Sequence, residues 1–462
     1  MENSIGTADL ESHFLQFRRG IIGIDQKIKT PLHSAIPMVY ADWTASGRCY
    51  QPIEDRLVNG FMPFIANTHT ETNASSAYTT RAYQNARQLI KRHVNAGEQD
   101  ILISAGSGMT DVVNKLQRIL GLRVPEQLRQ YIKLPEQEKP VVFITHMEHH
   151  SNHTSWLETI CDVVVVPPGK DGSVSLQHFE HAVGLYRERR VKIAAITACS
   201  NVTGITTPYH EIAMLIHKCG GYCFVDFACS APYVMIDMHP DDPEARLDAV
   251  YFSPHKFLGG PGASGILVFN ASLYNNTIPD VSGGGTVDWT NPWGGRKYVS
   301  NIEEKEDGGT PAILQTIKAA LAIELKETMG VRNIMAREQE LMQVLWDNLS
   351  HVNGIEMLAK AHTDRLGIIS LCVQGMHHND VVRQLNDKYG IQTRGGCSCA
   401  GTYGHYLLGV DKKRSKEITD MIDQGDHSEK PGWVRISIHP TMTEQEMVFI
   451  ASSLSEVVCG NF

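Results

Sequence analysis

Several features that would place the chain in a simple class are missing from its 462 residues. No run of basic residues stands out, and 42 Lys and Arg against 51 Asp and Glu leave a formal net charge of −9. Binding to nucleic acid or to an anionic membrane is therefore disfavoured. No apolar stretch approaches the roughly 18 residues that a membrane helix needs, so no membrane partner is expected.

Signals of a secreted protein are also scarce. The ten cysteines are spread through expected strands and helices, in a chain far larger than disulfide-framework domains, which predicts reduced thiols. The first residues, MENSIGTADLESHF, are polar and acidic and do not form a basic and then apolar leader. Together these observations predict a cytoplasmic protein.

What is present is an ordinary globular composition with a regular pattern. Hydrophobic residues make up 42% and charged residues 20%, which excludes collagen-like, disordered and coiled-coil chains. From about residue 100 to 270, short β-branched apolar runs alternate with helical lengths, which is typical of a sheet covered on both faces. We expect an α/β fold with a mainly parallel seven-stranded sheet. Its strands are predicted at Asp100–Ser104, Val141–Thr145, Asp162–Val166, Lys192–Thr197, Tyr222–Val225, Ala249–Phe252 and Gly265–Phe269.

A smaller C-terminal part follows this sheet. A long helix is predicted over Pro311–Met329, with Thr310 as its cap and Gly330 at its end, and a second helix over Asn333–Leu349. A final helix begins with a capping-box pattern. We expect a terminal arm (residues 1–35), a large domain (36–335) and a small α+β domain (336–462). The small domain is predicted to contain strand Gly367–Val373, helix Asn379–Tyr389, a Gly/Cys-rich loop Arg394–Gly409, strand Trp433–His439 and a helix capped by Thr443 and Glu446.

In such a fold, ligands bind beyond the carboxyl ends of the strands, so functional residues are expected there. After the first run comes AGSGMTD (residues 105–111), where small residues at a helix start could present N–H groups to an anion or form a tight turn. After the second run comes HMEHHSNH, in which His149 and His153 share a helical face. Solvated or stacking histidines are the alternative to a metal site, and no metal site is assigned because no acidic or sulfur ligand has a recognisable spacing nearby.

Asp226 and Lys256 follow two further strands. Asp226 is either a helix cap or the partner of a buried cation, and Lys256 is either a surface lysine in a Gly/Pro loop or an amine suited to an imine. Taken together, a lysine, a strand-end acid, an anion-binding turn and an upstream histidine are the parts that pyridoxal phosphate requires.

The order GSGMT, EHH, CSNVTG, VDFACSAP and FSPHKFLGGPG resembles the class V aminotransferase family of fold-type I pyridoxal phosphate enzymes. The likeness runs from about residue 40 to residue 441 and is closest to the branch of cysteine desulfurases and selenocysteine lyases. It implies that Lys256 carries the cofactor as an imine and that Asp226 pairs with the pyridinium nitrogen. It further implies that His149 stacks on the ring and assists proton transfer, and that Asn201 contacts the ring oxygen and the substrate.

The same resemblance assigns the phosphate and substrate groups. The phosphate would lie against Gly108, Met109 and Thr110, with hydrogen bonds from Ser253 and His255.

Two more positions concern the partner copy and the substrate. Thr310 would reach the phosphate of a partner subunit, which implies a homodimer. Arg435 would bind the carboxylate of a small amino-acid substrate, because a guanidinium forms a planar fork, and Arg394 would assist it; a solvated strand-edge arginine is the alternative for Arg435.

Two positions depart from the family pattern. Cys229 stands where desulfurases usually have a Gln that hydrogen-bonds the ring hydroxyl, and a thiol is a weak donor, so this contact is expected to be weak. Met109 stands where a small residue or a threonine is common, which leaves only its backbone N–H for the phosphate.

The segment RGGCSCAGTYGH (residues 394–405) resembles the family loop that bears a persulfide-forming cysteine. Cys399 falls at that place, and Cys397 is a resolving partner, a second acceptor or an inert thiol. A glycine-rich loop lets a thiol approach the site, whereas the aromatic tail of this segment could hold the loop rigid. Two ordinary thiols packed over the site are the alternative.

The resemblance therefore predicts a pyridoxal phosphate enzyme of the cysteine desulfurase or selenocysteine lyase type, which forms alanine and an enzyme persulfide and passes sulfur to an acceptor protein. Aminotransferase, epimerase or β-elimination chemistry on the same cofactor is the first alternative, because fold and cofactor do not choose the reaction. A zinc-dependent hydrolase using His149, His153 and a cysteine is an alternative from another class. A further alternative is a cofactor-bound protein that acts only as a binding partner.

Overall fold

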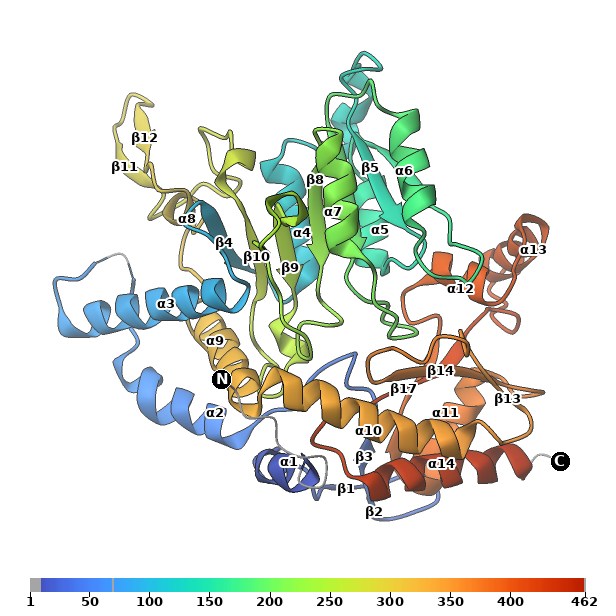
Figure 1. Ribbon diagram of the computed structural model, residues 1–462. Helices are drawn as coiled ribbons and strands as arrows, with labels where there is room; N and C mark the ends of the chain where they lie inside the picture. Colours follow the sequence, from blue (N-terminus) through green and yellow to red (C-terminus); the bar gives the residue numbers. More distant parts are fainter. Residues whose placement is uncertain (1–9, 69, 461–462) are drawn as a thin grey trace.

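The computed structural model describes residues 10–68 and 70–460. A seven-stranded sheet forms its centre, in the order β4-β10-β9-β8-β7-β5-β6 (Figure 1). β10 runs antiparallel to both of its neighbours, and every other pair in this sheet is parallel. The strands are β4 (Asp100–Ala105), β5 (Val141–Thr145), β6 (Asp162–Val166), β7 (Lys192–Thr197), β8 (Tyr222–Asp226), β9 (Ala249–Phe252) and β10 (Gly265–Asn270).

The mainly parallel α/β prediction is confirmed. Four of the expected strands have the predicted bounds, and β4, β8 and β10 are each longer by one residue. Alternate side chains enter different cores, since Phe143 packs in one cluster and Val142 and Ile144 in the other. Both faces of the sheet are therefore covered, which explains why its strands are almost continuously apolar.

Helices form these two covering layers. One core includes side chains from α4 (Met109–Ile119) and α5 (His150–Leu157), and the other includes side chains from α6 (Leu176–Leu185), α7 (Tyr209–Lys218) and α9 (Ile313–Met329).

The start of α9 corrects one prediction. Thr310 does not cap this helix, because Ala312 is its N-cap residue. Ala312 has φ −74° and ψ 65°, and the Ile313 N–H donates to Pro311 O over 2.8 Å, which is an inverse γ-turn. The helix begins only after this turn. Gly330 ends α9 as predicted, with φ 81°, and α10 (Val331–Leu349) follows at once, two residues earlier than expected.

The C-terminal part is a four-stranded antiparallel sheet, β13-β14-β17-β16, packed with helices, which confirms the predicted α+β character. The division of the chain near residue 335 stays a prediction. The capping box of the last helix is present, with Thr443 and Glu446 bonded reciprocally. The elements are β13 (Ile355–Met357), β14 (Ile368–Val373), α11 (His378–Tyr389), β16 (Arg394–Gly396), β17 (Trp433–Ser437) and α14 (Glu444–Cys459).

The N-terminal segment packs against this C-terminal part. β3 (Val39–Tyr40) pairs in parallel with β15 (Ile391–Gln392). Arg18, at the end of α1 (Leu10–Arg18), donates two 2.9 Å hydrogen bonds to the Glu446 carboxylate of α14. From residue 10 onward, the expected terminal arm contacts the C-terminal part through α1, and its residues 1–9 lie outside the described part of the chain.

Some elements were not expected. The segment predicted as a Gly/Cys-rich loop, Arg394–Gly409, consists instead of β16, a short turn and α12 (Gly401–Leu407). The other elements are β1 (Lys27–Ile28), β2 (Ile36–Pro37), α2 (Gln51–Arg56), α3 (Ala74–His93), β11 (Val287–Thr290), β12 (Arg296–Tyr298), α8 (Ile302–Lys305) and α13 (Lys412–Asp423).

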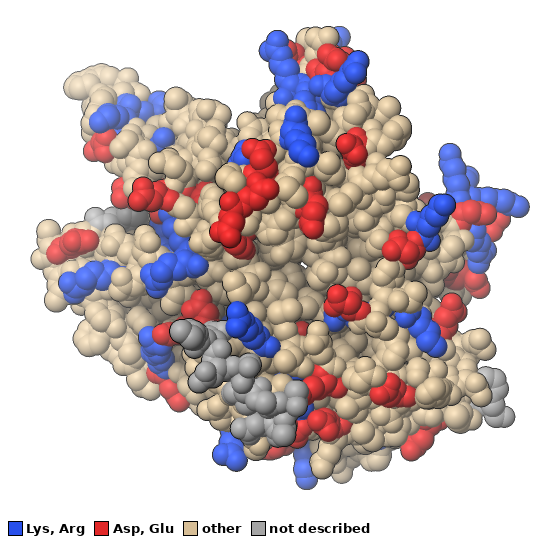
Figure 2. Space-filling model, viewed as in Figure 1, with Lys and Arg blue, Asp and Glu red and all other residues tan. Residues whose placement is uncertain are grey.

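The surface is mixed in charge. On the face shown in Figure 2, Lys and Arg side chains are interspersed with Asp and Glu, also on the projection that Figure 1 identifies as α13. Among residues 10–68 and 70–460, no helix combines the length and the apolar composition that crossing a membrane requires.

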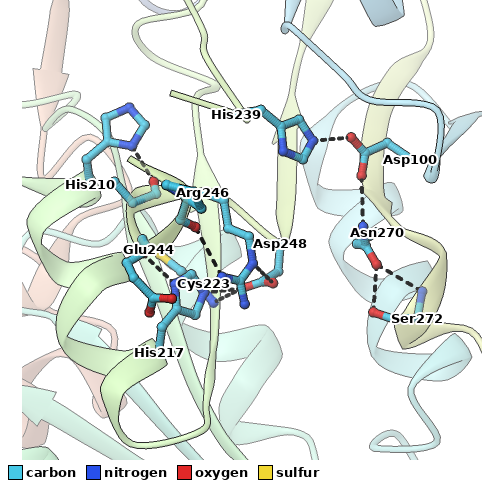
Figure 3. Close-up of polar contacts among 12 residues, drawn as sticks. Asp100, His210, His217, Cys223, His239, Glu244, Arg246, Asp248, Asn270 and Ser272 are labelled. Atoms are coloured by element: carbon cyan, nitrogen blue, oxygen red, sulfur yellow. Dashed lines mark hydrogen bonds and ion pairs between the residues drawn. The ribbon is translucent and has the colours of Figure 1, made fainter. Parts of the chain in front are cut away.

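A group of polar contacts secures the amino ends of the parallel strands (Figure 3). His217 contacts the Glu244 carbonyl through Nδ1 (2.6 Å) and Asp248 Oδ2 through Nε2 (2.8 Å). The same carboxylate oxygen accepts from the Cys223 N–H at the start of β8 (2.8 Å). Burial opposes a charged ring, but the Asp248 carboxylate and the Glu244 carbonyl outweigh it and raise the pKa of His217.

We expect Asp248→Asn to lower the free energy of unfolding by about 2 kcal/mol at pH 6, because it removes the carboxylate that accepts from a protonated His217. Since the pKa is raised, this stabilisation is complete below 6.5, the ordinary value for histidine, and is lost as the pH rises through the higher pKa of the folded state. The effect is therefore smaller at pH 9. Urea unfolding at both pH values measures it.

Asp288→Asn serves as the control, because Asp288 pairs with Lys297 over 2.8 Å between exposed side chains and such pairs contribute little. An Asp248→Asn effect of equal size at pH 6 and pH 9 would contradict a charged His217.

Candidate active site

A cavity of about 330 Å³ lies beyond the carboxyl ends of β7, β8 and β9. Its volume falls at the lower end of the roughly 300–1,000 Å³ found for small-molecule sites. Eleven of the predicted site residues line it, whereas Thr310 and Cys399 do not. The eleven are Gly108, Met109, Thr110, His149, Asn201, Asp226, Ser253, His255, Lys256, Arg394 and Arg435.

Lys256 ends a short 3₁₀ turn that directly follows β9. Burial lowers the pKa of its amine, and the charges of Arg435 and Arg394 act in the same direction, against Cys229 and Asp226. Within residues 10–68 and 70–460, no hydrogen bond or ion pair is formed by its side chain. The amine is thus more easily deprotonated than a surface lysine, and an unprotonated amine is the form that attacks an aldehyde.

Asp226 is the last residue of β8 and is buried. Its Oδ1 accepts from the Ala228 N–H over 2.8 Å, and its second oxygen has no hydrogen bond within the described part of the chain. Burial raises the pKa of Asp226 to about 6, although the Ala228 N–H and the Lys256 charge oppose the rise. A cationic N–H entering the cavity would find here a carboxylate with one oxygen available.

His149 is held in one tautomer. It caps α5, and its Nδ1 accepts from the Ser151 N–H over 3.1 Å, which leaves the ring proton on Nε2. Burial lowers the pKa of His149 to about 3, and Lys256 adds to this effect. The ring is therefore neutral at physiological pH and forms a flat wall of the cavity.

The start of α4 forms another part of the cavity lining. Met109 N–H donates to Ser253 Oγ over 2.8 Å, and Thr110 Oγ1 and Ser151 Oγ lie 2.7 Å apart. A Cβ at Gly108 would lie 3.1 Å from Ser253 Oγ, so a larger residue there would have to displace this hydroxyl. Hydroxyls and N–H groups at a helix start are suited to an anion such as a phosphate.

Arg435 is buried in β17 and reaches the cavity beside Asn201. One of its terminal nitrogens donates to Asn201 O (3.1 Å) and the other to Asp42 Oδ1 (2.5 Å), whereas Nε has no partner. Asp42 Oδ2 also lies 3.3 Å from Nε of Arg394. Asp42, which no sequence pattern singled out, therefore holds both arginines. The buried Nε and the equally unpaired Asn201 Oδ1 indicate a ligand with both acceptors and donors.

Two thiols in the cavity wall were also not predicted as a pair. Cys199 and Cys229 follow the neighbouring strands β7 and β8, and both line the cavity. A hydrogen bond from Cys199 lowers the pKa of the Cys229 thiol, and the charges of Lys256 and Arg435 act in the same direction against burial. Only the motif CSNVTG in the sequence contained a signal for Cys199.

These groups fit pyridoxal phosphate. Lys256 suits the aldehyde, the available oxygen of Asp226 suits the pyridinium nitrogen, and the neutral His149 ring suits stacking. The start of α4, with Ser253, suits the phosphate. All of them lie in one cavity of suitable size.

Both cysteines of the 394–405 segment lie outside the cavity lining. Cys399 is exposed and Cys397 is half-buried. Ser398 and Cys399 have φ values of 50° and 57°, in the left-handed region that costs a residue other than glycine about 1–2 kcal/mol each. The surrounding structure therefore has to hold this turn in place.

The zinc alternative lacks its ligands. His149 Nδ1 is bound to the Ser151 N–H, and His153 Nδ1 faces Thr402 Oγ1 at 3.3 Å. In the part of the chain that the structure describes, no group of three or more His, Cys, Asp and Glu side chains could hold a metal ion.

Comparisons with known proteins agree with this site. A family model described as Aminotransferase class-V matches residues 39–448. The chain is 30% identical over 371 residues to a probable cysteine desulfurase of Halalkalibacterium halodurans. The aligned region covers 79% of this chain and 84% of that protein. It is 27% identical over 382 residues to a probable cysteine desulfurase of Staphylococcus aureus, with 82% and 85% covered.

Solved structures share the fold. The apo structure of a cysteine desulfurase from Thermococcus onnurineus has a TM-score of 0.76 at 20% identity, with all of both chains covered. The cysteine desulfurase CsdA from Escherichia coli has a TM-score of 0.73 at 20% identity, with 99% of this chain and 100% of that chain covered.

Asp226→Asn tests the buried carboxylate. A rise in pKa from 3.8 to about 6 means that Asp226 costs the cofactor-free protein about 3 kcal/mol at high pH, and this cost develops as the pH rises from about 4 and is complete above about 6. We therefore expect the cofactor-free variant to be more stable than the parent at pH 8, with the difference vanishing below pH 4. The variant should also bind pyridoxal phosphate at least about tenfold more weakly.

Thermal unfolding across this pH range and titration with the cofactor measure the two effects. A variant that is less stable at pH 8 and binds the cofactor equally well would show that Asp226 has only a structural role.

Proposed function

The chain belongs to the class V aminotransferase family, whose enzymes depend on pyridoxal phosphate, and we propose that it removes sulfur from L-cysteine or selenium from L-selenocysteine. The observation that carries this proposal is the single cavity that unites Lys256, Asp226 and Arg435. The names of the relatives that are 27–30% identical support the same reaction.

Each residue of the cavity has its own role in the proposed reaction. When bound, pyridoxal phosphate withdraws electrons from the bonds at the substrate α-carbon. Lys256 would hold the cofactor through its amine, whose pKa burial lowers, and the same amine, once released, would accept the proton from the substrate α-carbon. Arg435 binds the substrate carboxylate through its unpaired Nε, while Asp42 fixes the guanidinium. The neutral His149 ring would pack on the cofactor ring and assist proton transfer by donating a hydrogen bond from Nε2.

The sulfur step uses a thiol of the enzyme. The Cys399 thiolate attacks the substrate sulfur, the bond between that sulfur and Cβ breaks, and its electron pair and a proton go to Cβ. L-cysteine and the Cys399 thiol thus become L-alanine and a Cys399 persulfide, with no oxidant or reductant. An acceptor protein then takes the outer sulfur.

We expect Cys399→Ala to lower the formation of sulfide and alanine from L-cysteine at least about 100-fold, because the nucleophile is removed. Cys219→Ala is the control, since Cys219 is an exposed thiol at the end of α7. Cys397→Ala shows whether the neighbouring thiol takes part. Assays with L-selenocysteine compare the two substrates.

Other class V chemistry is the second candidate, because Cys399 does not line the cavity. An aminotransferase or epimerase needs Lys256, Asp226 and Arg435 but no thiol nucleophile. Turnover of L-cysteine that is unchanged in Cys399→Ala, or turnover of another amino acid without sulfide, would favour this candidate over the desulfurase.

We also propose a homodimer in the cytoplasm. Thr310 lies in a second hollow, of about 600 Å³, outside the cavity that contains Lys256, which is the position expected if it serves a partner's phosphate. Exposed apolar side chains support an interface at this side of the molecule, on the left in Figure 1. They are Val58, Met62, Phe64, Ile65, Ile278, Val281, Trp289 and Trp293. The ten free cysteines support a reducing compartment.

Light scattering is expected to give twice the 51.3 kDa of one chain. Trp293→Glu should shift the protein toward the monomer, because Trp293 is 89% exposed in one copy and a charge would be buried in the dimer. Thr310→Ala should weaken cofactor binding and leave the mass unchanged. A monomer at micromolar concentration with full activity would contradict the dimer.

A further inference from the structure

The turn that carries Cys399 is fixed from the side of the cavity. Asn201 Nδ2 donates to Ser398 O over 2.8 Å, and Trp433 Nε1 donates to Ser398 Oγ over 3.1 Å. Asn201 and Ser398 are both buried. These bonds hold the first residue of the left-handed pair, whose backbone conformation is maintained only where the surroundings determine it.

His150 fixes the same turn from the other side. Its backbone N–H donates to Cys399 O over 2.7 Å, and its Nε2 accepts from the Gly401 N–H over 3.0 Å. His150 is the first residue of α5 and Gly401 the first of α12, so both N–H groups lack a partner within their own helix. His150 thus forms hydrogen bonds to the backbone on both sides of the buried Ala400. These bonds join the first residue of α5 to the first turn of α12.

The residues around His150 are adapted to this contact. A Cβ at position 401 would lie 3.2 Å from His150 Nε2, closer than side chains usually approach. One turn further along α5, His153 Nδ1 lies 3.3 Å from Thr402 Oγ1, so the contact continues along the helix. Burial lowers the pKa of His150, with Lys430 adding to the effect, which keeps Nε2 free to accept a hydrogen bond.

α5 therefore joins two parts of the site. His149 forms a wall of the cavity, and the adjacent His150 holds the turn that presents Cys399. A shift of α5 would move both together, so the spacing between the cavity and the thiol is set by two consecutive residues.

We propose that His150 is a positioning residue for Cys399, which fixes the backbone of this cysteine at the rim of the cavity by accepting from the Gly401 N–H. This proposal rests on the proposed function in one respect, that Cys399 receives the sulfur. It adds that the thiol is delivered by a fixed turn, so that the substrate sulfur has to reach the rim.

The test compares His150→Leu with His150→Gln in the cofactor-bound enzyme. Leucine removes the acceptor for the Gly401 N–H and keeps the backbone N–H, whereas the glutamine carbonyl can replace Nε2 as an acceptor. His150→Leu is expected to accelerate amide hydrogen exchange at Gly401 at least tenfold. It should lower the rate of persulfide formation from L-cysteine about tenfold, with KM changed less than twofold and the visible spectrum of the cofactor unchanged.

His150→Gln is expected to restore both the exchange protection and the rate to within about threefold of the parent. His181→Leu is the matched control, because His181 is an exposed histidine of α6. Thermal unfolding of all variants identifies a general loss of structure.

The outcomes separate this proposal from the proposed function. If the parent enzyme forms no persulfide, the desulfurase proposal fails, but exchange at Gly401 and alkylation of Cys399 by iodoacetamide still report on the turn. Unchanged exchange and alkylation in His150→Leu would overturn the positioning role. So would a loss of activity accompanied by a rise in KM and by faster exchange throughout the small sheet, or a loss that His150→Gln does not reverse.

Discussion

Ionisable groups buried together in one cavity are the constraint on which the rest of the structure depends. A buried carboxylate such as Asp226 is costly unless a partner neutralises it, and burial makes the Lys256 ammonium unfavourable as well. The fold surrounds both groups with the carboxyl ends of parallel strands and two apolar layers, at a cavity that both of them line. Burying Asp226 and Lys256 without partners costs folding free energy. The same two groups bind a cofactor that supplies these partners, so the cost of burial also makes them reactive toward it.

Much of this arrangement could be predicted from the sequence, for identifiable reasons. The strands were predictable because a sheet covered on both faces needs continuous apolar runs, and strand-end residues such as Asp226 meet at one edge whatever the loops do. The start of α9 was not predictable, because a cap pattern and an inverse γ-turn at Ala312 fit the same residues. Asp42 was missed because its partner Arg435 is 393 residues away in the chain.

In the histidine-rich segment, the sequence pattern and the observed contacts differ. In sequence, His149, His150 and His153 are equivalent members of one cluster, and a metal site was a reasonable hypothesis. In the structure each has its own partner: the cavity and Ser151 for His149, Gly401 for His150 and Thr402 for His153. Spacing along a helix predicts which side chains share a face, but the partner on the opposite element decides their chemistry.

The position of β10 has a consequence for how the chain comes into being. β4 is the first strand of the large sheet in the chain, yet its neighbour is β10, the last one, with Gly265 opposite Ala105. During synthesis β4 therefore emerges long before the strand that covers its inner edge, and the ribosome must add some 160 residues before the sheet can close. β3 stays unpaired even longer, because its partner β15 lies near the end of the chain. Nascent chains of this enzyme thus expose the unpaired edge of β4 during most of translation. Binding of a chaperone to this edge during that interval would prevent aggregation.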